Sequence, residues 1–295
     1  MPGTDLVIPV AAQRDARSSR GGCGGLHPRI LTSVSLSTRS RIRTIRHLGV
    51  GPAFLGTVLH SSDLEPPSGV SRLTTRLNQG IFEAGRTPVW VWDSERCRRY
   101  WATRTSEGDD NRPADYAEKP LAIVDLLHEF WSPEVTSNDE VLELGCNVGA
   151  NLERLRQLGY HNLRGVEINA NALAELPHHF PELAREAQLM QGSFEELLPT
   201  LESGSVDVVL TMAVLLHLHP QSDFVFDEMV RIARRYVCVV EAESATLAYI
   251  FARNYGRVFA RRGWREIRAR HITPDSLYDV GADYHGYTAR LLERR

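Results

Sequence analysis

The stretch VLELGCNVGANL, residues 141–152, decides how the rest of this chain is interpreted. Its mostly apolar start leads into a turn that contains Gly145 and Gly149, and a helical pattern then continues as far as Gly159. Glycine permits a positive φ angle and lets a backbone approach a ligand closely. A helix that begins at such a turn presents unpaired N–H groups and a partial positive charge. The stretch therefore predicts a strand, a turn and a helix that together hold a ligand.

After residue 139, short apolar segments alternate with helical ones. The segments expected as strands are nearly apolar throughout, which is typical of strands covered on both faces; they are residues 140–144, 163–168, 186–192, 206–214 and 236–243. The helical segment that begins at Ser193 carries Glu196 three residues later, as in a capping box. This alternation predicts an α/β fold, with a doubly wound and mostly parallel sheet between two layers of helices.

The last fifty residues have a different pattern. We expect a long helix at 245–263 and two final strands at 264–272 and 286–294, which would form a C-terminal antiparallel hairpin. Leu121, Val124, Leu127 and Phe130 repeat at a spacing of three, which predicts another helix ahead of the first strand.

The chain divides by pattern into three regions. Residues 1–85 show no sustained periodicity and are expected to form a low-order basic extension. Residues 86–135, which include part of the aromatic-rich stretch 81–104, are expected to form a helical cap segment. Residues 136–295 are expected to form the ligand-binding domain.

Composition excludes several classes of protein. The chain has 295 residues, is 42% hydrophobic and carries a net charge of −3, so it needs no disulfides to form a core. Its four cysteines are scattered without metal-ligand spacing, which favours a reducing cytoplasm and no metal site. No apolar run is long enough to cross a membrane. Between Arg14 and Arg46 there are eight arginines and one acid, which suits a targeting sequence, a nucleic-acid-binding arm or a disordered extension.

Counting the residues of the turn separates two kinds of cofactor. A dinucleotide site needs G-x-G-x-x-G, and Asn147 breaks that pattern. A site for S-adenosylmethionine favours an acid followed by glycines at alternate positions, and Glu143, Gly145 and Gly149 match. Asn147 alone departs from that pattern, and asparagine tolerates a left-handed backbone. Glu167, about 20 residues beyond the turn, suits the ribose hydroxyls of either cofactor.

These motifs resemble those of class I S-adenosylmethionine-dependent methyltransferases, over residues 116–272. The resembling stretches are VLELGCNVGANL, GVEINANAL, MQGSFEELL and VDVVLTMAVLLHLHP, and Ser193 stands where an acid often faces the adenine amine. The details are similar to a bacterial subgroup that acts in sugar, polysaccharide or natural-product pathways. The resemblance implies S-adenosylmethionine as cofactor, bound by Glu143, Gly145, Cys146, Asn147, Gly149, Glu167, Ile168, Ser193, Phe194, Thr211 and Met212.

Candidates for the chemistry follow the fourth and fifth strands. His217 and His219 are candidate proton acceptors, or else hydrogen-bonded loop residues or adenine contacts. Glu241 and Glu243 lie on one side of a strand end, where two carboxylates could receive an amine or sugar hydroxyls, or could simply face solvent. The remaining candidates for acceptor binding lie in the stretch ARNY and are Arg253, Asn254 and Tyr255.

The sequence therefore favours a cytoplasmic methyltransferase that acts at oxygen or nitrogen of a small molecule. Nucleic acid is not the expected acceptor, because the chain outside the N-terminal region is not basic overall. Two alternatives stay open: a catalytically silent methyltransferase-like binding module, and a nicotinamide-dependent oxidoreductase, which the glycine count disfavours.

Overall fold

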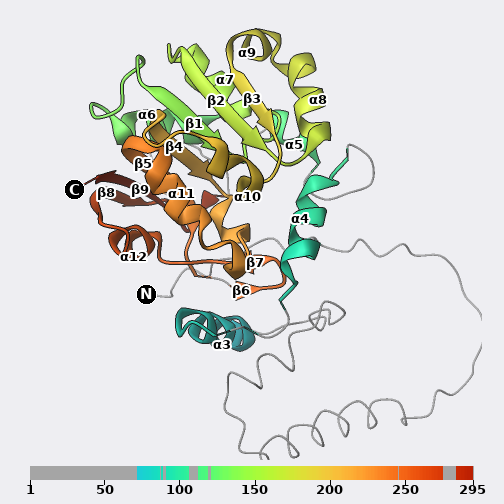
Figure 1. Cartoon of the computed structure of the whole chain (residues 1–295), viewed down its shortest axis with the longest axis vertical. Coiled ribbons are helices and arrows are strands. Elements are labelled where there is room, and N and C mark those ends of the chain that lie inside the picture. The colour runs from blue at the N-terminus through green and yellow to red at the C-terminus, as the bar shows by residue number, and fades with distance from the viewer. Residues whose placement is uncertain are drawn as a thin grey trace, which may run out of the picture.

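The computed structural model describes residues 72–86, 88, 91–105, 112–118, 121–244, 246–274 and 284–294. A seven-stranded sheet in the order β3-β2-β1-β4-β5-β9-β8 runs through the molecule (Figure 1). Its strands are β1 (Glu140–Leu144), β2 (Asn162–Glu167), β3 (Gln188–Gln191), β4 (Val206–Met212), β5 (Ala233–Ala242), β8 (Trp264–His271) and β9 (Tyr287–Arg294). The first five strands are parallel, and β9 pairs antiparallel with both β5 and β8. The expected α/β fold and C-terminal hairpin are confirmed.

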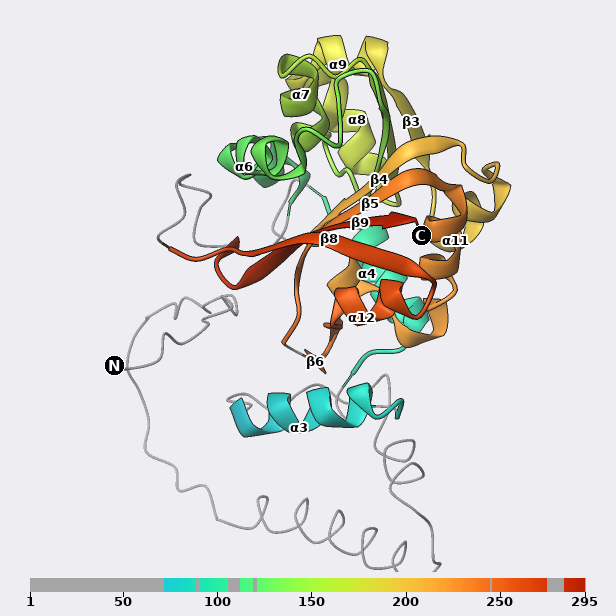
Figure 2. The same cartoon turned by 90° about the vertical axis from the view of Figure 1, so that its left-hand side faces the viewer.

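Helices cover both faces of the sheet (Figures 1 and 2). Successive strand residues point to opposite faces, so Val141 packs in one core and Leu142 in the other. One core includes residues of α6 (Ala122–Trp131), α7 (Ala150–Gln157), α8 (Ala170–His179) and α9 (Pro181–Glu186). The other includes residues of the short α10 (Phe194–Leu197) and η1 (Leu198–Thr200), α11 (Val225–Ile232) and α12 (Tyr255–Ala260).

A third, smaller core joins the segment before the sheet to the chain after β5. Val91, Trp92, Cys97 and Phe251 are buried together there. The elements around it are α3 (Arg72–Glu83), α4 (Ser94–Ala102) and the short hairpin of β6 (Thr246–Leu247) and β7 (Ile250–Phe251). A further short helix, α5 (Pro113–Ala117), contacts α8.

Two expectations about secondary structure were wrong. Residues 245–263 do not form one helix, because the chain folds back at Ala248, which has a φ of 51°, and the apolar side chains that suggested a helix divide between the third core and α12. The low-order region does not extend to residue 85, because α3 begins at Arg72. The predictions for residues 1–71 lie outside the described residues.

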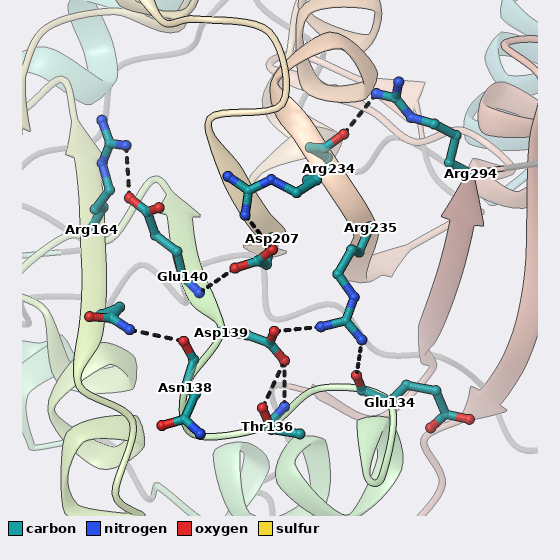
Figure 3. A network of polar contacts seen from close by, with 12 residues as sticks. Glu134, Thr136, Asn138, Asp139, Glu140, Arg164, Asp207, Arg234, Arg235 and Arg294 are labelled. Carbon is teal, nitrogen blue, oxygen red and sulfur yellow. Dashed lines mark hydrogen bonds and ion pairs between the residues drawn. The ribbon is translucent and has the colours of Figure 1, made fainter.

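Ion pairs and hydrogen bonds join the strands at their amino ends (Figure 3). Asp207 accepts a hydrogen bond from the Glu140 backbone N–H and forms an ion pair with Arg234. Asp139 forms an ion pair with Arg235, and Glu140 with Arg164. These contacts connect β1, β2, β4 and β5 at the ends of the strands opposite the glycine turn.

Candidate functional site

The glycine turn at the carboxyl end of β1 has three left-handed residues. The φ angles are 75° at Gly145, 50° at Asn147 and 81° at Gly149, so the expectation that Asn147 tolerates this backbone is confirmed. The N–H groups of Gly145 and Cys146 donate to the Val166 carbonyl. The turn is therefore fixed to the end of β2.

A side chain at Gly145 would also meet a neighbouring loop. A Cβ atom there would lie 2.6 Å from Cγ2 of Val214, which follows β4. At Gly149 it would lie 2.7 Å from Leu183 and 2.8 Å from Leu176. The glycines thus permit close packing of protein on protein, a reason the sequence did not reveal.

Glu167, at the end of β2, accepts backbone hydrogen bonds from the glycine turn and from the start of the next helix. Its Oε2 accepts the Asn147 N–H at 2.9 Å, and its Oε1 accepts the Asn169 N–H at 2.8 Å. Burial raises the pKa of this carboxyl, and the backbone hydrogen bonds act in the opposite direction. Because each carboxylate oxygen has two lone pairs, Glu167 retains acceptor capacity for two hydroxyl groups.

Glu143 lies beneath the turn and is 1% exposed. Asn151 donates to its Oε1 at 2.7 Å, whereas its Oε2 is buried and has no hydrogen-bond partner among the described residues. Burial raises the pKa of Glu143 to about 8, and the nearby Glu167 also raises it. An unpaired buried acid is costly, and a cation close by would lower that cost.

A cavity of about 320 Å³ opens at the carboxyl ends of the strands. Ten of the eighteen predicted site residues line it: Gly145, Cys146, Asn147, Glu167, Ile168, Ser193, Phe194, Met212, His217 and His219. Ser193 also caps α10, in the expected capping box with Glu196. The predicted cofactor residues that do not line the cavity are Glu143, Gly149 and Thr211.

His217 lines the cavity and uses only one of its ring nitrogens in a hydrogen bond to the described residues. It belongs to η2 (Leu215–His217), directly after β4, and its Nδ1 lies 3.1 Å from the Tyr249 carbonyl oxygen. Because a carbonyl only accepts, we assign the proton to Nδ1, which leaves a lone pair on Nε2. Nε2 has no hydrogen-bond partner among the described residues. Burial lowers the pKa of His217 to about 4, so the ring is neutral at pH 7.

His219 is placed differently, although it also lines the cavity. Its Nδ1 accepts the backbone N–H of Gln221 at 3.2 Å and caps η3 (Pro220–Ser222). Its ring packs edge-on against Phe251. The two histidines therefore use the Nδ1 atom in opposite ways, as donor in His217 and as acceptor in His219.

Glu241 anchors the loop that carries His217. The fully buried carboxylate accepts backbone N–H groups of Val214, Leu215 and Leu216 at 3.0–3.3 Å. Burial raises its pKa to about 7, and these hydrogen bonds act in the opposite direction. Glu241 does not line the cavity, so it acts on the loop and does not reach a ligand there.

The residues predicted to bind the acceptor do not line the cavity either. Glu243 pairs with Arg290 and accepts the Tyr255 N–H. Arg253 is 7% exposed, pairs with Asp223 and donates to three backbone carbonyls. Asn254 caps α12, and the Tyr255 side chain is fully buried. Each of these side chains stabilises the fold around the β6–β7 hairpin.

The other side of the cavity comes from residues that sequence reasoning did not select. Ser94, Cys97, Arg98 and Trp101 of α4 line it. The helix is attached at both ends, through Ser94 to Gln221 and through the Arg104 carbonyl to Asn169. Figure 1 shows α4 between α5 and the β6–β7 hairpin. The only signal in the sequence was the aromatic-rich stretch 81–104.

Comparison with known proteins agrees with this geometry. A family model described as a methyltransferase domain matches residues 142–237, which run from β1 into β5. Over these residues the chain is similar to a methyltransferase domain. The cofactor of this family is S-adenosylmethionine. None of the curated proteins compared with the chain matches it.

Solved structures share the fold of the methyltransferase domain at low sequence identity. Geranyl diphosphate C-methyltransferase from Streptomyces coelicolor A3(2) has 13% identity and a TM-score of 0.50, covering 68% of this chain and 97% of that one. Magnesium protoporphyrin IX methyltransferase from Synechocystis PCC 6803 has 14% identity and a TM-score of 0.49, covering 69% and 100%. A putative sarcosine dimethylglycine methyltransferase from Galdieria sulphuraria has 16% identity and a TM-score of 0.49, covering 68% and 97%.

The acids near the glycine turn suit a sulfonium nucleoside. Glu167 lines the cavity and retains lone pairs for ribose hydroxyls. Glu143 does not line it, but its buried oxygen has no hydrogen-bond partner among the described residues, and a cationic amino end nearby would stabilise its charged form. Ile168 and Phe194 add apolar surface for a purine. In the described part of the chain, no cluster of three or more ligand-type side chains is placed to hold a metal. Among the helices described, none is long and apolar enough to cross a membrane.

Proposed function

We propose that this chain is a methyltransferase for a small molecule, that the acceptor atom is oxygen or nitrogen, and that His217 accepts the acceptor's proton. One observation carries the proposal. His217, whose Nε2 has no hydrogen-bond partner among the described residues, lines the same cavity as Asn147, Glu167 and Phe194. Methyl transfer to oxygen or nitrogen requires a proton acceptor close to the bound cofactor, and one cavity would hold both.

Each residue has a separate task in this proposal. Glu167 binds the ribose of S-adenosylmethionine, and the buried Glu143 acts on its cationic amino end by electrostatic attraction; the cofactor supplies a methyl group activated by a sulfonium charge. Glu241 holds the loop that positions His217. The cap segment at 86–135 contributes α4, which restricts water at the cavity, and residues 136–295 form the methyltransferase domain. Natural products, sugars and polysaccharide precursors are the acceptor classes that the sequence resemblance implies.

A catalytically silent binding module is the second candidate. The low pKa of His217, about 4, favours it, because such an imidazole is a weak base. Incubating the full chain with methyl-labelled S-adenosylmethionine and separate panels of hydroxyarenes, amines and sugars distinguishes the two. Labelled product and S-adenosylhomocysteine in equal amounts support the enzyme. Tight cofactor binding without transfer to any panel would support the silent module, and binding of NAD alone would contradict both.

A further inference from the structure

Three aromatic rings form one wall of the cavity beside the free nitrogen of His217. The ring of Trp101 lies 4.6 Å from that of His217, and the ring of Tyr249 lies 5.4 Å from it. Trp101 and Tyr249 also meet edge to face at 6.0 Å. All three line the cavity, and we call them the aromatic wall.

The aromatic wall is supported from behind. Tyr249 stacks on Tyr100 at 4.9 Å and contacts Trp92 at 4.8 Å. Trp92 is buried in the third core and does not line the cavity. A wall held in this way keeps its geometry without a ligand, and pre-organised aromatic surface binds flat rings at low entropic cost.

Charge beside the aromatic wall disfavours a cationic acceptor. Arg104 lies over the ring of Tyr100 at 3.8 Å and Arg96 over that of Trp92 at 4.2 Å. Arg98 and Arg104 also line the cavity. Glu167 and Glu195 line it as well, and Glu195 forms an ion pair with Arg98. The charges at the cavity are therefore balanced within the protein, which suits an uncharged acceptor better than a quaternary ammonium or a protonated amine.

The aromatic wall is poorly suited to a sugar. A sugar presents many hydroxyls, and a site that selects one needs several hydrogen-bonding side chains beside it. Glu243, Arg253 and Asn254, the residues expected to supply them, are engaged elsewhere in the fold. The aromatic wall contributes the imidazole of His217, the hydroxyl of Tyr249 and the indole N–H of Trp101, which is buried without an acceptor among the described residues. Several other polar residues that line the cavity, including Asn147, Glu167 and Ser193, are those predicted to bind the cofactor.

The weakness of His217 as a base points to the same class of acceptor. An aryl hydroxyl such as that of tyrosine has a pKa of about 10, whereas bulk water has a pKa of about 15.7. A neutral imidazole with a lowered pKa is therefore better matched to an aryl hydroxyl than to an alcohol of a sugar.

We propose that the acceptor is an uncharged hydroxylated aromatic compound, whose ring lies against Trp101, His217 and Tyr249. In the transfer, the aryl oxygen gives its proton to Nε2 of His217 and forms a bond to the methyl carbon. The carbon–sulfur bond of S-adenosylmethionine breaks, and its electron pair stays on the sulfur of S-adenosylhomocysteine. This proposal rests on the proposed methyltransferase function and narrows its acceptor.

Calorimetry on the full chain saturated with S-adenosylhomocysteine tests the proposal with three probes: 2-naphthol, phenyltrimethylammonium and methyl α-D-glucopyranoside. We expect 2-naphthol to bind at least tenfold more tightly than the cation, and the glucoside to give no saturable heat. Tighter binding of the cation or of the glucoside would overturn the proposal. If S-adenosylhomocysteine itself does not bind, the methyltransferase function fails instead, so the two failures are distinguishable.

Variants locate the ring. Trp101→Leu should weaken 2-naphthol binding at least tenfold while the affinity for S-adenosylhomocysteine changes less than threefold, and Trp101→Phe should restore most of the loss. Trp92→Phe is the matched control, because Trp92 belongs to the same cluster but does not line the cavity, and it should leave both affinities unchanged. Unchanged naphthol binding in a folded Trp101→Leu protein, or equal losses in Trp101→Leu and Trp92→Phe, would overturn the proposal.

Discussion

Apart from Glu243, which pairs with Arg290, the acids at the two ends of the central parallel strands have opposite surroundings. At the amino ends, Asp139, Glu140 and Asp207 each form an ion pair with an arginine (Figure 3). At the carboxyl ends, Glu143, Glu167 and Glu241 have no arginine or lysine partner within the described residues. Their oxygens accept hydrogen bonds from backbone N–H groups or from Asn151, and burial raises the pKa of all three.

The difference separates stabilising acids from functional ones. An arginine partner neutralises the charge of an acid and occupies its acceptor oxygens, so that few remain for a ligand. The ion pairs at the amino ends of the strands therefore stabilise the sheet. A buried acid without a cation is costly for the fold. Two such acids near the glycine turn, Glu143 and Glu167, suit a ligand that is positively charged and carries hydroxyl groups, as S-adenosylmethionine does and a pyrophosphate does not.

The largest expected effect comes from filling the turn at the carboxyl edge. Gly145→Val should abolish binding of S-adenosylhomocysteine, a loss of more than 100-fold by calorimetry. The new side chain would meet Val214 and displace the loop that carries His217, and the φ of 75° would strain it further.

Gly159→Val is the matched control for backbone strain. Its φ is 92°, but a Cβ there would meet nothing within 4 Å. This variant should lose stability by about 1–2 kcal/mol and still bind S-adenosylhomocysteine. Equal loss of binding in both variants would show that strain alone, and not the contact with Val214, explains the effect.

The next largest effect distinguishes the two histidines. His217→Asn retains an N–H donor for the Tyr249 carbonyl but removes Nε2, so kcat should fall by roughly 10²–10⁴-fold while cofactor affinity stays within threefold. His219→Asn retains an acceptor for the Gln221 N–H and should lose far less activity. Steady-state kinetics with an aryl acceptor measure both.

The pH profile gives an independent reading of His217. Because its pKa is lowered to about 4, the ring is protonated and inactive only below that value. Activity should therefore fall as the pH drops through about 4, with no inflection near 6.5 from this group. An inflection near 6.5 that disappears in His217→Asn would contradict the assignment of a buried neutral base.

A smaller effect compares one acid from each edge. Glu241→Gln should lower kcat about tenfold with little change in cofactor affinity, because the amide has one acceptor oxygen where three N–H groups need to be held. Asp207→Asn removes an ion pair to a half-exposed Arg234 at the amino edge and should change stability by less than about 1 kcal/mol, with activity retained. Equal kcat values for the two variants would show that acids at the carboxyl ends of the strands are no more important for activity than acids at the amino ends.

A separate effect concerns the pH dependence of stability. Glu143 has a pKa of about 8 in the folded chain, above the usual value for glutamate. Between about pH 4.3 and 8 the unfolded chain has therefore released this proton while the folded chain retains it, so the free energy of unfolding falls as the pH rises. Urea unfolding at pH 5.5, 7 and 8.5 should show this decline, and Glu143→Gln should make it shallower. An equally steep decline in the variant would show that a group other than Glu143 causes the pH dependence.

Sequence reasoning succeeded where a property is local to a motif. The left-handed Asn147, the capping box at Ser193 and the strand-end position of Glu167 depend on residues within a few positions of each other. It did not succeed for the conformation of 245–255, where Ala248 turns the chain back and contacts with α3 and α4 decide the outcome. Such contacts join segments more than 140 residues apart, and no local pattern encodes them.

Contacts between remote segments also explain why the residues predicted to bind the acceptor do not line the cavity. Glu243 and Arg253 were selected because charged groups near a strand end often bind ligands, but their partners Arg290 and Asp223 are remote in sequence. Trp101 and Tyr249 were not selected, because single aromatic residues are common in cores. Only the folded chain shows that they lie beside His217.

The central claim is that S-adenosylmethionine binds at the turn that begins at Gly145, with Glu167 at its ribose. Calorimetric titration of S-adenosylhomocysteine and of NAD into the full chain and into Glu167→Ala tests it most directly. The account predicts one S-adenosylhomocysteine bound per chain, no binding of NAD, and a loss of at least 30-fold in affinity for Glu167→Ala. Binding of NAD in place of S-adenosylhomocysteine, or equal affinity in a folded Glu167→Ala protein, would contradict it.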